Sequence, residues 1–107
     1  MKIEMHLQET VTLEDFAKRH DLTMAVYERN PVEIPFNNLK KYFCYFKYLE
    51  ILEGPILRST SGDGDTINEA IEEYCKELSN KKIVIKATDP KSRKVLTTPT
   101  ITPHWEQ

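Results

Sequence analysis

The chain has 107 residues, of which 39% are apolar and 30% charged, with a formal net charge of -2 at neutral pH. This length and balance predict one globular domain with a modest core, and they exclude a disordered chain and a protein that binds nucleic acid through bulk positive charge. No apolar run approaches the roughly 18 residues that cross a bilayer, and the first residues are too polar for a signal peptide. We therefore expect a cytoplasmic protein with no membrane partner.

The first predicted element is a short helix that begins after Thr12. Thr12 is suited to cap the helix, Asp15 follows three residues later, and basic residues crowd the last turn. Its small apolar face must dock onto the rest of the fold and consists of Leu13, Phe16 and Ala17. Alternating residues predict a first strand from Leu22 to Arg29, and Pro and Asn residues predict a loop over 30–39.

Aromatic residues dominate the second predicted strand, from Lys41 to Leu49. Period-two alternation places Tyr42, Cys44, Phe46 and Tyr48 on one face and Phe43, Tyr45 and Leu49 on the other. A turn at 53–55 leads to a third strand, Ile56 to Ser61, which must be antiparallel because the connection is too short for a crossover.

A turn over 61–65 then leads into an amphipathic helix ending near Leu78. Thr66 and Glu69 have the spacing of a capping box, in which each side chain binds a free backbone donor of the first turn. A single apolar stripe follows and contains Ile67, Ala70, Ile71, Tyr74, Cys75 and Leu78. We assign the turn's glycines to unusual backbone dihedral angles and its aspartates to the helix dipole.

The remaining residues predict a fourth strand, Lys82 to Ala87, and a short candidate edge strand, Arg93 to Thr97. The fold class is therefore α+β: a short N-terminal helix, three antiparallel strands, one amphipathic helix packed on the sheet, a fourth strand and the short edge strand. We expect a single domain over 1–97 and an extended C-terminal tail over 98–107, where prolines restrict the chain.

Charge is segregated in the second half of the chain. Six acidic residues and one lysine lie between positions 63 and 77, whereas six basic residues and one aspartate lie between 81 and 94. We expect the acidic set to bind a partner, the alternative being a solvated helix face: Asp63, Asp65, Glu69, Glu72, Glu73 and Glu77. The basic set is the candidate nucleic-acid surface of an alternative function: Lys81, Lys82, Lys86, Lys91, Arg93 and Lys94.

The aromatic strand supplies a second candidate partner surface, at Phe43 and Tyr45. Because helices can cover one face of the sheet, these rings need another cover. The candidates are a host protein or a second copy of the chain, the N-terminal helix, and single-stranded nucleic acid stacked on the rings.

We expect no metal, no cofactor and no enzymatic activity. Asp63 and Asp65 flank a glycine as in the start of a calcium loop, but Tyr74 stands where such a loop needs a bidentate glutamate. The three histidines are scattered, without a pattern that predicts a nucleophile. Cys44 and Cys75 are expected as small buried hydrophobic residues.

Two family resemblances follow from these elements. The β-β-β-α-β order, with Gly64-Asp65-Thr66-Ile67-Asn68-Glu69-Ala70 before the helix, resembles the partial ribonuclease-H-like domain of HicB-type antitoxins and, more distantly, double-stranded-RNA-binding domains. The whole chain, through Leu13-Glu14-Asp15-Phe16-Ala17, Tyr42-Phe43-Cys44-Tyr45-Phe46 and Glu69-Ala70-Ile71-Glu72-Glu73-Tyr74, is similar to small proteins of tailed phages and prophages. Neither resemblance carries an activity, since acidic residues stand where a double-stranded-RNA binder has lysines.

The phage resemblance implies a small accessory protein in the cytoplasm of a host cell. We expect it to bind and inhibit a host protein stoichiometrically, a defence nuclease being one candidate target, as for anti-CRISPR proteins. The alternative is a nucleic-acid-binding regulator that uses the region from Lys81 to Lys94.

Overall fold

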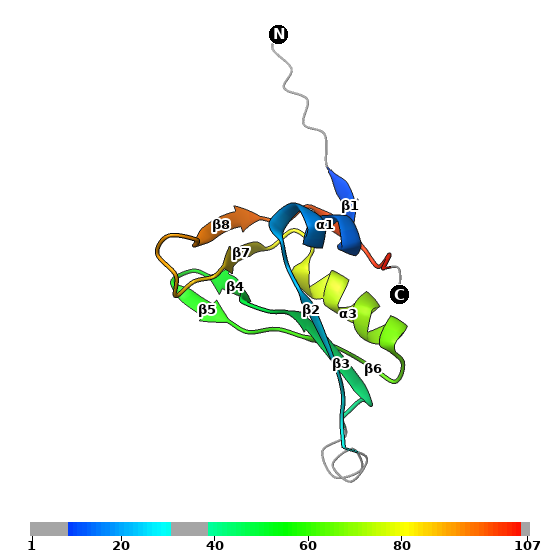
Figure 1. Ribbon diagram of the computed structural model, residues 1–107. Helices are drawn as coiled ribbons and strands as arrows, with labels where there is room; N and C mark the ends of the chain where they lie inside the picture. The colour runs from blue at the N-terminus through cyan, green and yellow to red at the C-terminus, as the bar shows by residue number, and fades with distance from the viewer. Residues whose placement is uncertain (1–8, 31–38, 106–107) are drawn as a thin grey trace.

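The computed structural model describes residues 9–30 and 39–105. Its elements in chain order are β1 (Thr10–Thr12), α1 (Leu13–His20), β2 (Met24–Glu28), β3 (Tyr42–Phe46), β4 (Leu49–Glu53), β5 (Ile56–Arg58), β6 (Gly62–Gly64), α3 (Ile67–Leu78), β7 (Lys82–Ile85), β8 (Lys94–Thr97) and β9 (Thr100–Thr102) (Figure 1). The predicted α+β class is confirmed, while most of the predicted loop over 30–39 lies outside the described residues. In the described ranges, no helix has the length and apolar character needed to cross a bilayer.

The strands form three small sheets where we expected one. Their strand orders are β1-β9, β2-β3-β6 and β5-β4-β7-β8, and every pairing except β1 with β9 is antiparallel. In Figure 1 the β7–β8 hairpin and β5 lie to the left, and α3 lies to the right.

The single sheet is divided because both strands of the predicted central hairpin are interrupted. The expected strand from Lys41 to Leu49 breaks at Tyr48, whose φ is 65°, into β3 and β4. The expected strand from Ile56 to Ser61 likewise becomes β5 and β6. Cys44 pairs with Gly62, and Ile51 pairs with Arg58. Between these two pairs the chain advances seven residues from Cys44 to Ile51 but four residues from Arg58 to Gly62. The excess residues force the two strands apart at the break.

Both helices pack on the same core. The buried faces of α1 and α3 meet the inward side chains of β3, β4, β7 and β9, and the rings of Phe16 and Phe46 lie 6.2 Å apart. Asp15 N donates to Thr12 Oγ1 at 3.1 Å, which confirms the predicted cap of α1. Because Phe46 points to this core, α1 leaves the opposite face of β3, which carries Phe43 and Tyr45, uncovered.

Two glycines allow β6 to lie against α3. A Cβ atom on Gly62 would lie 2.1 Å from Ala70 O, and one on Gly64 would lie 2.4 Å from Ala70 N. Both residues are buried in a strand, and neither has a positive φ. The assignment of these glycines to a turn with unusual dihedral angles is therefore wrong, since their role is close contact between backbones.

The predicted tail is extended, but its boundary at residue 97 does not separate it from the domain. Thr10–Thr12 and Thr100–Thr102 pair in parallel, and Ile101 is buried in the common core. Lys81 N donates to the hydroxyl of the buried Thr98, which itself hydrogen-bonds Leu78 O. We expected a tail because prolines flank this short segment. Its pairing with β1, about 90 positions earlier in the chain, cannot be recognised from the local sequence.

Candidate functional site

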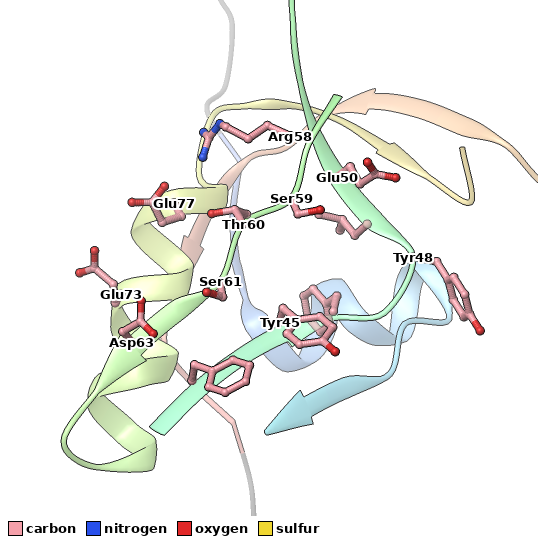
Figure 2. Close-up of a pocket in the computed structure, with 13 residues that line it drawn as sticks. Tyr45, Tyr48, Glu50, Arg58, Ser59, Thr60, Ser61, Asp63, Glu73 and Glu77 are labelled. Atoms are coloured by element: carbon pink, nitrogen blue, oxygen red, sulfur yellow. The ribbon is translucent and has the colours of Figure 1, made fainter. Parts of the chain in front are cut away.

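A hollow of about 730 Å³ lies where the central hairpin is interrupted (Figure 2). We call this site the hollow; its lining is Phe43, Tyr45, Phe46, Tyr48, Leu49, Glu50, Arg58, Ser59, Thr60, Ser61, Asp63, Glu73 and Glu77. Figure 2 shows the segment over 59–61 between Glu73 and Glu77 of α3 on one side and Tyr45, Tyr48 and Glu50 on the other. The hollow thus brings three of the six predicted acidic residues, Asp63, Glu73 and Glu77, together with the predicted aromatic pair.

Three aromatic side chains stack on the outward face of β2 and β3. The Tyr27 ring lies 5.1 Å from that of Phe43 and 5.9 Å from that of Tyr45, with interplanar angles of 16° and 13°. The Arg29 guanidinium lies 4.5 Å from the Phe43 ring centre. The side-chain hydrogen bond with Tyr27 raises the pKa of Tyr45, which keeps its hydroxyl protonated. Tyr48 adds a ring at the rim that is 73% exposed.

Half of the predicted acidic surface is already bound within the chain. Asp63 pairs with Arg29 at 2.6 Å, and Asp65 lies 3.5 Å from Lys40 Nζ. Glu69 N donates to Thr66 Oγ1 at 3.1 Å, which confirms Thr66 as the helix cap. The Glu69 carboxylate departs from the predicted capping box, because its Oε2 accepts at 2.9 Å from Asp65 N, one residue before the cap. These three carboxylates have structural partners that compete with any external ligand.

The other three predicted glutamates lie on two flanks of α3. Glu73 and Glu77 line the hollow, whereas Glu72 lines a separate depression with Lys76 and Asn80. Glu50, which sequence reasoning missed, joins Glu73 and Glu77 in the hollow. Within the described part of the chain, none of these four glutamates forms an ion pair or a hydrogen bond.

A buried tyrosine hydroxyl supports the edge of the hollow. Lys47 N donates to Thr23 O on the β2 side, so the N–H of Phe46 faces the opposite side, where β6 has already ended. The buried Tyr74 Oη accepts this N–H at 2.8 Å. Burial raises the pKa of Tyr74, so its hydroxyl stays neutral. Tyr74 therefore replaces the backbone acceptor that the interrupted strand no longer provides.

Sequence reasoning also missed the polar segment over 59–61. Its signal was present, since Ser59-Thr60-Ser61 is a polar run within a predicted strand. The registers of β5 and β6 end at Arg58 and Gly62, and no backbone hydrogen bond of the three residues is found in the described ranges. This segment offers unpaired donors and acceptors at the centre of the hollow.

The predicted basic surface surrounds the β7–β8 hairpin, and none of its six residues lines the hollow, although Lys86 N donates to the carbonyl oxygen of Tyr48 at its rim at 2.8 Å. Its six side chains are exposed except for Lys86, which is half-buried and has a φ of 53°. Asp89 Oδ1 accepts from Lys91 N at 3.1 Å, and this bond lowers the pKa of Asp89. The carboxylate of Asp89, the single acidic residue of this region, is thus hydrogen-bonded within its own turn.

Two observations concern the predicted metal and cysteine residues. Over 9–30 and 39–105, no three His, Cys, Asp or Glu side chains are grouped to hold a metal ion. Burial raises the pKa of Cys44 to about 11 and that of Cys75 to about 12, so both thiols stay protonated near neutral pH. The hollow combines rings, carboxylates and free backbone groups, an arrangement suited to binding a cation.

Comparison of the chain with protein-family models, curated proteins and solved structures finds no match in any of the three.

Proposed function

We propose that this chain is a small phage or prophage accessory protein that binds and inhibits a host protein stoichiometrically, a defence nuclease being one candidate target. The observation that carries the proposal is the hollow, which joins the half-buried rings of Phe43 and Tyr45 and the exposed ring of Tyr48 to three glutamate carboxylates that have no partner in the described residues. The phage context rests on the sequence resemblance given above.

Charge and shape favour a basic partner surface. Four carboxylates and one guanidinium line the hollow. Asp63 pairs with Arg29 and Arg58 pairs with Glu53, so the carboxylates left without an ion pair in the described residues are those of Glu50, Glu73 and Glu77. Proteins that handle nucleic acid present basic grooves, and an acidic surface steers association with them. Aromatic side chains beside the charges supply the apolar contact that anchors most protein interfaces.

The test is affinity capture from a nuclease-treated bacterial lysate with matched charge variants. We expect Glu73→Lys/Glu77→Lys to fold normally and to lose the partner, mainly through a slower association rate. The control is Glu72→Lys, which changes the same helix on the flank outside the hollow. Glu69 is left intact because its capping role would confuse stability with binding.

A captured partner should lose its activity on titration and reach a plateau at a one-to-one ratio. Unchanged capture kinetics in the folded double variant would assign these glutamates to a solvated surface.

The alternative function is a nucleic-acid-binding regulator that works through the region from Lys81 to Lys94. It is favoured by one observation: in the described residues, none of the six basic side chains of the β7–β8 region forms an ion pair. If it is correct, affinity for a generic oligonucleotide should fall on the order of tenfold or more between about 50 and 200 mM salt. We expect no appreciable binding at physiological salt, because the acidic hollow repels phosphate.

A further inference from the structure

The segment over 59–61 differs from the rest of the central hairpin in its backbone. The β4–β5 ladder stops at Arg58 and the β3–β6 ladder starts again at Gly62. Across the gap, Phe46 N–H is satisfied by Tyr74 Oη, but Ser59, Thr60 and Ser61 have no backbone hydrogen bond in the described ranges. Unpaired, accessible strand backbone is what extended peptides bind in β-augmentation.

The two sides of this segment differ in chemistry. Figure 2 shows Tyr45 and Tyr48 on one side and Glu73 and Glu77 on the other. Ring faces attract cations, and carboxylates accept charge-assisted hydrogen bonds. A cationic side chain in the hollow is suited to both sides.

Among cationic side chains, arginine fits this combination best. Its planar guanidinium stacks on aromatic rings and carries five donors, enough for a carboxylate and for backbone carbonyl oxygens together. A lysine ammonium is more strongly hydrated and stacks less well. Arg58 does not fill this role, because its guanidinium is held by Glu53 at the edge of the hollow.

We propose that the hollow binds an extended segment of a partner protein that carries an arginine. The segment lies along residues 59–61 and hydrogen-bonds their free backbone groups, and its guanidinium lies between the Tyr45 ring and the carboxylates of Glu73 and Glu77. This assignment rests on the proposed function, since it specifies the chemistry of the partner at the same site.

The test is an NMR titration of the ¹⁵N-labelled full chain with a capped pentapeptide, acetyl-Thr-Val-Arg-Val-Thr-amide. We expect saturable shifts of the Ser59, Thr60 and Ser61 amides. Replacing the peptide's arginine by norleucine, which keeps the apolar stem and removes the charge, should weaken binding about tenfold or more.

Matched protein variants locate the guanidinium. We expect Glu73→Gln/Glu77→Gln to weaken binding of the arginine peptide about tenfold and to leave binding of the norleucine peptide unchanged. Glu72→Gln, on the other flank of α3, should leave both unchanged. Equal binding of the two peptides, shifts that map away from 59–61, or no saturation up to about 5 mM peptide overturns the proposal.

The two proposals fail differently. If the pentapeptide does not bind but capture of a host protein depends on Glu73 and Glu77, the function stands and the arginine segment is wrong. If the pentapeptide binds as described but capture is indifferent to these glutamates, the hollow binds such peptides and the proposed function is wrong.

Discussion

At the scale of single residues, the hydroxyl of Tyr74 has an unusual position for a helix residue facing a core. It is buried and accepts the backbone N–H of Phe46 at 2.8 Å, at the end of an interrupted strand pairing. A phenylalanine would fill nearly the same volume and leave that N–H without an acceptor.

We expect Tyr74→Phe to lower the free energy of unfolding by about 1 to 3 kcal/mol, the cost of a buried unsatisfied donor. Urea unfolding followed by circular dichroism measures this change. Tyr48→Phe is the control, because the Tyr48 side chain is 73% exposed and its change should stay within about 0.5 kcal/mol. Equal effects of the two substitutions would mean that water replaces the lost hydroxyl at Phe46.

His20 gives the protein a pH-dependent stability. Burial, together with the charges of Lys94 and Arg19, lowers the pKa of His20, and its Nδ1 has no hydrogen-bond partner in the described residues. The unfolded chain therefore binds this proton more readily than the folded chain, so stability falls as the pH drops through the ordinary histidine pKa of about 6.5.

The expected result is a lower free energy of unfolding at about pH 5.5 than at about pH 7.5, with a smaller difference in His20→Gln. Urea titrations at both pH values measure it. The same difference in both proteins would assign the pH dependence to other groups.

At the scale of secondary-structure elements, features that depend on local spacing were predicted correctly, whereas contacts between elements were not predicted. The helix caps at Thr66 and Thr12 were predicted because spacing within one turn determines them. Alternation predicted the two faces of β3 correctly, with Cys44 buried and Phe43 half-exposed. It is wrong beyond the break, because Tyr48, expected beside Cys44, is 73% exposed, and Leu49, expected beside Phe43, is buried in the core.

The interruption of the central hairpin had no such signal. A tyrosine with positive φ, like Tyr48, is uncommon. Tyr48 lies in the turn between β3 and β4 with its side chain exposed, and its carbonyl oxygen accepts from the distant Lys86 N at 2.8 Å. The ion-pair partners of Asp63 and Asp65 could not be predicted either, because Arg29 and Lys40 are distant in the sequence and reach them across strands. The hollow lies at the interruption, so its residues were predicted in part and its existence was not.

Gly62 gives a direct test of how β6 meets α3. We expect Gly62→Ala to cost about 3 kcal/mol or more, since the added Cβ would lie 2.1 Å from Ala70 O and 2.4 Å from Tyr74 N, both backbone atoms that cannot move aside. Thermal unfolding measures the loss.

Gly54→Ala is the matched control for this substitution. Gly54 has a φ of 58° with no atom within 4 Å of an added Cβ, so its cost should be about 1 to 2 kcal/mol from backbone strain alone. A Gly62→Ala cost no larger than that of Gly54→Ala would show that α3 can shift away from β6.

At the scale of the whole molecule, the C-terminal segment closes the core. Thr98 joins the end of α3 to β7, Ile101 is buried, and the Trp105 ring lies 6.2 Å from that of Phe46. This arrangement could not be predicted from local spacing, because residues 98–102 carry the short polar and proline pattern of a tail.

We expect a chain ending at Thr97 to lose cooperative unfolding, while a chain ending at Trp105 keeps it. The shorter chain exposes the pockets of Ile101 and Trp105 and leaves the Lys81 N–H without the Thr98 hydroxyl. Circular dichroism during heating distinguishes them. Ile101→Ala is the milder variant and avoids aggregation of the short form, with an expected loss of about 2 to 4 kcal/mol.

The parallel pairing of β1 with β9 also has a consequence for synthesis in the cell. Thr10 pairs with Thr100, so β1 cannot find its partner until nearly the whole domain has left the ribosome. At about 5 to 20 residues per second, the interval between these two residues is roughly 5 to 18 s. During that interval the aromatic β3 and the apolar face of α1 are made but lack part of their cover, so the nascent chain passes through a period of exposure to chaperones and aggregation.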